Sequence, residues 1–383
     1  MLDKNRFQLF KNDWFSFSLS RGFSLLLCLV ILGCTKFDSA TPATKEAAVI
    51  YQLAVPEFPE FRWREVRAFN LPLNNPPFVP PAKAEFMRAD DAVLGVILGG
   101  EARAYPWSLM ANFHAVNDYL NGEPIIVNVC EACNGGAAFH ATVVDTVLDI
   151  RPRGLKNGTW YGEDFQTGSY WYPFIGEAFE GPLKGTKLTR IRVYFSSWKE
   201  WVQEHPNTTV VVVTDEIRAR PHGRASKMAD QCLFNPKYMG KITDPKPNPN
   251  RDLLPGYTLV FGLIPKLGEK PKAITIESLG GKMGGKTALV QTNLNNTPVL
   301  LMLQHQYQVG AYKRVLNGTA LDMKIITESP LLMTDQHGNK WNMWGRTTEG
   351  INHPSELELV DGYMAKWYEW VENFPETELI KAE

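Results

Sequence analysis

Residues 110–140, MANFHAVNDYLNGEPIIVNVCEACNGGAAFH, gather most of the reactive side chains of the chain into one short span. A helix-like run carrying His114, Asn117 and Asp118 leads through a turn at Asn121-Gly122 into the apolar run 125–129, which has the composition of a strand. That strand delivers the motif Cys130-Glu131-Ala132-Cys133 onto Asn134-Gly135-Gly136. We therefore predict a strand that ends in a CxxC turn.

An internal duplication organises the rest of the sequence. The segment TrpLysGluTrpVal at 198–202 recurs as TrpTyrGluTrpVal at 367–371, and Gly176, Gly181 and Pro206 have counterparts at the same spacing. Each copy closes with a short helix whose tryptophans, Trp201 and Trp370, have the spacing of a buried face. The sequence thus predicts an α+β, strand-rich fold in which two degenerate repeats pack into one pseudo-symmetric body.

Composition changes along the chain suggest four parts. Residues 1–33 are expected to be a lipoprotein signal peptide and residues 34–60 a tether. Residues 61–250 form the first repeat, with the CxxC motif and a basic, proline-rich loop, and residues 251–383 form the second, degenerate repeat. Because reactive residues that occur in one copy alone are candidates for function, the CxxC motif of the first repeat is the leading candidate.

The N-terminal segment has the features of an export signal. Four basic residues precede the apolar run 23–32, which is too short to span a membrane comfortably. The tetrapeptide Ile31-Leu32-Gly33-Cys34 resembles a bacterial lipobox, in which the cysteine is acylated. We expect lipidation of Cys34, a membrane partner reached through this lipid, and a place in the bacterial cell envelope, at the outer membrane, facing the periplasm or the outside. The alternative is a cleaved secretory signal with an incidental cysteine.

The overall charge gives no sign of a nucleic-acid partner. The formal net charge is −1, and no block of lysine and arginine is interleaved with aromatic residues. The sequence names no small-molecule or protein partner either.

Export changes how the cysteines are interpreted, because thiols in an oxidising compartment are usually paired. With Cys28 in the signal and Cys34 lipidated, Cys130, Cys133 and Cys232 remain. Either two of these three form a disulfide, or a metal ion holds thiolates. Cys232 is therefore a possible additional thiol of the site.

Several further segments carry a family resemblance: GEARAYP at 100–106, HAVND at 114–118, the CxxC motif, QTGSYW at 166–171 and GPLKG at 181–185. With them the chain resembles a bacterial family known only as a domain of unknown function, DUF3179, over nearly all of its length after Cys34. Members of that family typically have Cys-Pro-Leu-Cys, where this chain has Glu131 and Ala132 between the cysteines. The resemblance implies a site at the motif but no activity.

Metal binding is the first interpretation of the motif. Cys130 and Cys133 can point at one ion, with His114 as a nitrogen ligand and His140 as a candidate fourth ligand. Asn117 or Asp118 would orient the imidazole through its other nitrogen. Two thiolates with imidazole suit copper or zinc, and an open position would permit catalysis.

Two other interpretations stay open. The first is a thiol–disulfide redox protein, since CxxC is the motif of such enzymes, although Asn134-Gly135-Gly136 disfavours the helix that follows a thioredoxin-type motif. The second is a structural disulfide in a non-catalytic binding module. Whether the protein is an enzyme is left undecided by these patterns.

Overall fold

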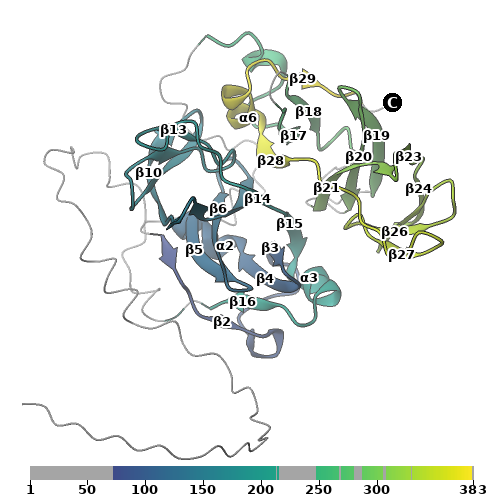
Figure 1. Cartoon of the computed structure of the whole chain (residues 1–383), viewed down its shortest axis with the longest axis horizontal. Helices are drawn as coiled ribbons and strands as arrows, with labels where there is room; N and C mark the ends of the chain where they lie inside the picture. Colours follow the sequence, from purple (N-terminus) through teal and green to yellow (C-terminus); the bar gives the residue numbers. More distant parts are fainter. Residues whose placement is uncertain are drawn as a thin grey trace, which may run out of the picture. The chain divides into compact units, whose positions relative to one another are not determined.

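The computed structural model of the chain describes residues 72–212, 214, 247–266, 269–279, 287–304, 308–328 and 330–381 (Figure 1). Strands dominate these residues, which confirms the strand-rich expectation. The α-helices among them are short: α2 (Trp107–Phe113), α3 (Trp198–Glu204) and α6 (Trp367–Asn373). Within these ranges no helix has the length and apolar character needed to cross a membrane.

The CxxC motif belongs to a five-stranded sheet in the order β1-β5-β6-β7-β14. Its strands are β1 (Leu73–Asn74), β5 (Ala115–Leu120), β6 (Glu123–Cys130), β7 (Gly135–His140) and β14 (Arg190–Ile191). Strands β5 and β6 form an antiparallel hairpin around Asn121 and Gly122, which both have positive φ angles, as a tight hairpin turn requires. The predicted apolar strand and its preceding turn are therefore confirmed.

The expected helix over residues 114–118 is wrong. Helix α2 ends at Phe113, and His114 follows in a left-handed backbone conformation with φ of 62°. Ala115 then begins β5, in which Asn117 pairs with Ile126 and Asp118 with Ile125. Hydrogen bonding to the apolar strand β6 thus decides the conformation of this segment, while helical character stops one residue before His114.

A second five-stranded sheet has the order β15-β3-β4-β16-β2. It is formed by β15 (Val193–Ser197), β3 (Ala92–Leu98), β4 (Glu101–Pro106), β16 (Thr209–Val211) and β2 (Phe78–Val79). Helix α3 covers this sheet because Trp201 lies directly over Gly95, where a Cβ atom would be 2.2 Å from the indole ring. The indole N–H donates to Thr208 Oγ1 at 2.8 Å, so the buried ring has its polar atom satisfied.

Residues 247–381 contain a sheet with the order β28-β17-β18-β29. Its strands are β28 (Gly362–Lys366), β17 (Leu259–Leu263), β18 (Lys272–Thr275) and β29 (Glu378–Leu379). The central hairpin is antiparallel and the last strand is parallel to β18, the same directions as in β15-β3-β4-β16. Trp370 lies over Gly262 and donates to Thr377 Oγ1 at 2.9 Å, as Trp201 does over Gly95.

Two four-stranded sheets repeat a second local pattern. One comprises β10 (Ile150–Lys156), β11 (Thr159–Asp164), β12 (Tyr170–Trp171) and β13 (Ala178–Glu180); the other comprises β24 (Lys324–Glu328), β25 (Leu331–Thr334), β26 (Lys340–Asn342) and β27 (Thr347–Glu349). In the first, the indole N–H of Trp171 donates to Asp164 at 2.8 Å, and in the second Trp341 donates to Asp335 at 2.9 Å. A buried tryptophan tied to an aspartate thus organises each sheet.

The remaining strands form one further sheet and two small hairpins. Strands β19 (Ala288–Leu294), β20 (Thr297–Gln304) and β21 (Gln308–Lys313) form an antiparallel sheet, and two small hairpins pair β8 (Thr142–Val143) with β9 (Thr146–Val147) and β22 (Val315–Leu316) with β23 (Thr319–Ala320). Short 3-10 helices lie at η2 (Pro81–Lys83) and η3 (Arg251–Leu253).

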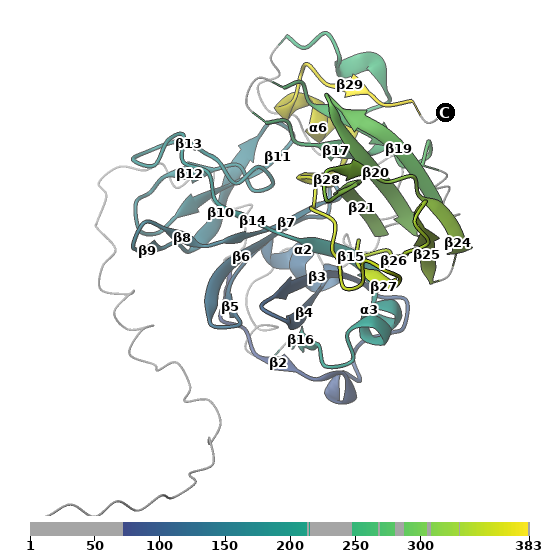
Figure 2. The same cartoon turned by 45° about the vertical axis from the view of Figure 1, so that its right-hand side comes forward.

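Residues 72–212 and 247–381 pack against each other, and one strand of each part contacts a sheet of the other part. Strand β28 lies against β7, and β15 lies against β21 (Figures 1 and 2). One hydrophobic cluster joins Cys130, Cys133 and Trp160 to Trp367 and Tyr368. The CxxC motif therefore lies where the two parts of the chain share a core.

Candidate functional site

The CxxC motif forms the turn between β6 and β7. Cys130 is the last residue of β6 and pairs with Gly135, the first residue of β7. The two cysteines are joined by a disulfide, with their Cα atoms 5.6 Å apart. Asn134 turns the chain with φ of 56°, and a Cβ atom at Gly135 would lie 2.8 Å from the ring of Phe174. The glycine is needed because an aromatic ring occupies the space of a side chain.

Both sulfur atoms are buried, and each has a hydrogen-bond donor. Cys130 is 5% exposed and Cys133 is 0% exposed. The backbone N–H of Cys133 donates to Cys130 Sγ at 3.3 Å. Thr159 Oγ1 lies 3.4 Å from Cys133 Sγ, and its hydroxyl must be the donor because a disulfide sulfur carries no proton. Such donors stabilise a thiolate more than a disulfide, because they favour the charged form.

The turn is also attached to the distant C-terminal part of the chain. The backbone N–H of Lys366 donates to Cys133 O at 2.7 Å. Lys366 is the N-cap residue of α6, so the helix begins at the CxxC turn. Trp367 and Tyr368, the first two residues of α6, pack in the same hydrophobic cluster as the disulfide.

His114 lies beside the turn and faces its second residue. His114 Nδ1 is 3.3 Å from Glu131 Oε2, and the two side chains are 13% and 11% exposed. The imidazole stacks on the indole of Trp160, with ring centroids 5.9 Å apart, and Trp160 Nε1 donates to Val129 O at 2.9 Å. The backbone of His114 is held on both sides, since its N–H donates to Met110 O and its C=O accepts from Val129. An imidazole–carboxylate pair is thus fixed next to the disulfide.

His140 does not join this group, which corrects the predicted ligand set. It pairs with Ile125 at the opposite end of the β6–β7 hairpin from Cys130. That places it roughly 17 Å along the strand from the cysteines. Its Nδ1 atom instead lies 3.0 Å from Glu123 Oε2 at a partly exposed position.

Asn117 and Asp118 bind elsewhere and do not orient His114. Asn117 donates to Ile150 O and accepts from Ile150 N–H, which ties β5 to β10. Asp118 Oδ2 accepts from Arg103 Nη1 at 2.7 Å and from the Tyr105 hydroxyl at 2.6 Å. Burial raises the pKa of Asp118 even though Arg103 opposes the shift. Both residues therefore connect strands.

Three residues of the site, Glu131, Thr159 and Lys366, are not predicted from the sequence. Glu131 stands out there only as a departure from the family pattern, although a carboxylate inside a CxxC motif is itself a signal. Thr159 and Lys366 carry no sequence signal, because sheet pairing and packing between distant segments bring them to the turn.

No group of three or more histidine, cysteine, aspartate or glutamate side chains within the described ranges is arranged to hold a metal ion. The remaining set at the turn is the disulfide with His114 and Glu131. Cys34 and Cys232 lie outside the described residues.

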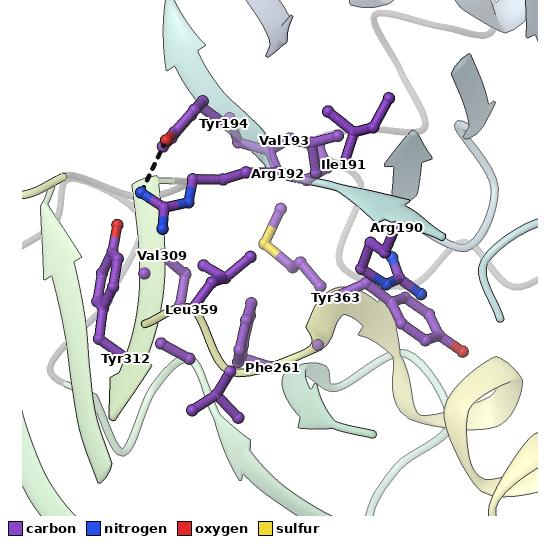
Figure 3. Close-up of a pocket in the computed structure, with 16 residues that line it drawn as sticks. Arg190, Ile191, Arg192, Val193, Tyr194, Phe261, Val309, Tyr312, Leu359 and Tyr363 are labelled. Carbon is purple, nitrogen blue, oxygen red and sulfur yellow. Dashed lines mark hydrogen bonds between the residues drawn. The ribbon is translucent and has the colours of Figure 1, made fainter. Parts of the chain in front are cut away.

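A cavity at the junction of β14, β15, β21 and β28 offers no alternative site for a substrate. Its volume is about 30 Å³, enough for one or a few water molecules. Figure 3 shows Arg192 turned toward the hydroxyl of Tyr194, which it reaches at 3.2 Å, and Arg190 beside Tyr363. Apolar side chains such as Phe261 and Leu359 form much of the rest of the wall.

Residues 71–377 match the family described as "Protein of unknown function (DUF3179)". The chain belongs to this family. The match covers both parts of the described structure and the whole CxxC site. No curated protein and no solved structure matches the chain. Membership in DUF3179 thus bears out the resemblance without adding an activity.

Proposed function

We propose that this protein is an exported, lipid-anchored thiol–disulfide exchange protein whose redox centre is the Cys130–Cys133 pair. The observation that carries the proposal is the imidazole–carboxylate pair of His114 and Glu131, fixed beside a disulfide. A hydrogen-bond donor at each sulfur supports it further, because the reduced form would have thiolates to stabilise.

The reaction is a two-electron exchange. An external thiolate attacks one sulfur of the disulfide, forms a mixed disulfide and releases the other sulfur as a thiolate. A second external thiolate then attacks the external sulfur of that mixed disulfide. The protein ends as a dithiol after gaining two protons and two electrons, and the external pair of thiols ends as a disulfide. The reverse sequence oxidises an external dithiol.

His114 and Glu131 serve proton transfer in this scheme. His114 Nδ1 lies 3.3 Å from Glu131 Oε2, at ion-pair distance and without a hydrogen bond between these two atoms. A small turn of the ring that aims an Nδ1–H at the carboxylate would leave Nε2 as a base, the arrangement by which carboxylates fix a histidine tautomer. Nε2 would take the proton of an incoming thiol and return it to a released thiolate. Because Trp160 holds the ring by stacking, the imidazole is kept beside the turn in both steps.

A purely structural role is the weaker alternative for this disulfide. It closes a loop of only four residues, and in the chain-entropy account so short a loop contributes about 2 kcal/mol, the low end for disulfides. The hairpin β6–β7 and the Lys366 hydrogen bond already fix the same turn. A disulfide at this turn therefore restrains the chain little beyond what these hydrogen bonds already do.

The test is a redox titration of the folded protein in thiol–disulfide buffers, with free thiols counted by alkylation and mass spectrometry. We expect a reversible two-electron transition that is lost in Cys130→Ser and in Cys133→Ser. His114→Ala should slow exchange, and His140→Ala, a matched histidine change away from the turn, should not. A disulfide that stays closed in every buffer until the protein unfolds would refute the exchange function.

A second candidate function is metal binding by the reduced pair. The observation in its favour is that His114 lies 3.3 Å from Glu131, one of the two residues between the cysteines. After reduction of the disulfide, the two thiolates would offer a pair of ligands to a soft ion such as copper(I) or zinc, and the imidazole would become a third ligand if it turned toward them. We expect about one ion per reduced chain after reconstitution, weaker binding in His114→Ala and unchanged binding in His140→Ala. If reduced protein retains neither ion, this candidate fails.

We also propose that residues 72–212 and 247–381 are diverged copies of one ancestral unit. Support comes from the repeated order and directions of the β15-β3-β4-β16 and β28-β17-β18-β29 sheets. The exchanged contacts of β28 with β7 and of β15 with β21 fit a pseudo-twofold relation between the copies. Anchoring through acylated Cys34, and with it a place in the bacterial cell envelope, rests on the N-terminal sequence alone.

A further inference from the structure

We infer that Cys130 Sγ is the sulfur attacked by the external thiolate, that Cys133 Sγ is the leaving sulfur, and that the external partner is a low-molecular-weight thiol. This inference rests on the proposed exchange function and adds direction and substrate class to it.

Exposure and attachment distinguish the two sulfurs. Cys130 retains 5% of its surface, whereas Cys133 has none and lies in the core shared with Trp367 and Tyr368. The main chain of Cys133 is held by the Lys366 N–H at 2.7 Å. Of the two cysteines, only Cys130 thus retains any exposed surface, so it is the better candidate for attack once the turn opens, while Cys133 is held in place and can attack the mixed disulfide in return.

The hydrogen bonds fit the same direction. When the external thiolate bonds to Cys130 Sγ, the bonding electrons of the disulfide pass to Cys133 Sγ, which becomes a thiolate. The hydroxyl of Thr159 already points at that atom from 3.4 Å and stabilises the developing charge. In the reduced protein, the Cys133 N–H at 3.3 Å favours the thiolate of Cys130, the sulfur that starts the reverse reaction.

The surroundings of Cys130 restrict the size of its partner. Glu131 is 9% exposed and Asn134 is 3% exposed, and the His114 side chain retains only 13% of its surface. A thiol on a folded protein surface brings its own backbone and neighbours, which cannot enter between such buried groups. A free thiol of the size of cysteine is much smaller, so it would require less displacement of His114 and Glu131 to reach Cys130 than a protein thiol would.

The direction is tested on the unaltered sequence. The reduced, folded protein is treated with excess iodoacetamide for increasing times, and peptide fragmentation compares the labelling of Cys130 with that of Cys133, because other cysteines of the chain also consume the reagent. We expect labelling of Cys130, with Cys133 labelled only after unfolding. Equal or preferred labelling of Cys133 in the folded protein would overturn the assignment, as would failure of both cysteines to react.

Variants that lack one cysteine of the motif give a second reading of the direction. Cys133→Ser incubated with cystine should form a stable cysteine adduct at Cys130, while Cys130→Ser should form none at Cys133. Thr159→Val should slow reduction of the otherwise unaltered disulfide roughly tenfold, the effect expected for losing a hydrogen bond to a developing charge. Thr159→Ser should restore the rate. Reduction of Thr159→Val at the unaltered rate would remove Thr159 from its positioning role.

Substrate class is tested by comparing reduction rates with free cysteine and with reduced thioredoxin at equal thiol concentration. We expect free cysteine to react faster. If only thioredoxin reduces the disulfide, exchange survives and the small-thiol inference fails. If neither thiol reduces the folded protein, the proposed function itself fails.

Discussion

Glu369 is a carboxyl group buried in α6, one residue beyond the aromatic pair that packs on the disulfide. It is 1% exposed, and burial raises its pKa to about 8, although hydrogen bonds from Tyr363 and Asn373 favour the charged form. The Tyr363 hydroxyl lies 3.2 Å from each carboxyl oxygen. The corresponding residue of α3, Glu200, instead accepts from the hydroxyl of the N-cap residue Ser197 at 2.8 Å, and its backbone N–H donates to the same hydroxyl at 3.3 Å. The same residue type thus has two different environments in two similar helices.

This burial predicts a pH-dependent stability. The folded pKa lies above the unfolded value of 4.5, so the folded protein holds a proton that the unfolded chain releases between these values. The stabilisation is complete below pH 4.5 and is lost as the pH rises through about 8. Glu369→Gln should remove this loss, on the order of 3 kcal/mol, in urea unfolding measured from pH 5 to pH 9.

Glu200→Gln is the matched control for this measurement, because its side chain is held at a helix N-terminus without full burial. It should leave the pH dependence as in the unaltered protein. Parallel profiles for Glu369→Gln and the unaltered protein would show that Glu369 is charged in the fold across this range.

Residue identities near the motif were predictable only where the signal is local. The sequence marked Cys130, Cys133 and His114, and the structure places His114 against the turn that holds both cysteines. It placed His140 in the same group because the residues are close along the chain. Hairpin geometry separates them, since the two ends of a paired strand lie far apart. Short sequence distance is thus a poor guide to spatial distance along a strand.

At the scale of elements, helices α3 and α6 are anchored in the same way. Trp201 and Trp370 each lie over a glycine of the central strand and donate to a threonine. Both indoles are completely buried. The sequence predicted both helices from the spacing of their tryptophans. The end of α2 at Phe113 could not be predicted from the sequence, because pairing of residues 115–120 with β6 outweighs their helical tendency.

Because Trp201 and Trp370 make the same contacts, truncation of either side chain should destabilise the protein by a similar amount. Trp201→Ala and Trp370→Ala should each lower the free energy of unfolding by about 3–5 kcal/mol, because each leaves a large cavity and an unsatisfied threonine. Chemical denaturation followed by circular dichroism measures both. A negligible effect at either position would show that its ring is not part of the core.

At the scale of the whole molecule, we expect acylation of Cys34 to decide where the protein works. If Cys34 is acylated, Cys34→Ala should move the protein from the membrane fraction to the soluble envelope fraction, since no other lipid attachment is expected. Cell fractionation with immunoblotting measures the distribution, and thermal unfolding of both forms provides the control for the fold. Membrane retention of Cys34→Ala would mean that another part of the chain holds it there.

The contact between β28 and β7 joins two segments that are far apart in the sequence, and this separation sets the order in which the CxxC turn is formed and covered. Cys130 and Cys133 are made early, whereas Lys366 and the start of α6, which cover them, are among the last residues to be made. If the chain is exported as proposed and crosses the membrane N-terminus first, the CxxC turn reaches the oxidising compartment before β28 does. The disulfide can form during that interval, and the arrival of β28 then encloses a bond that has already formed.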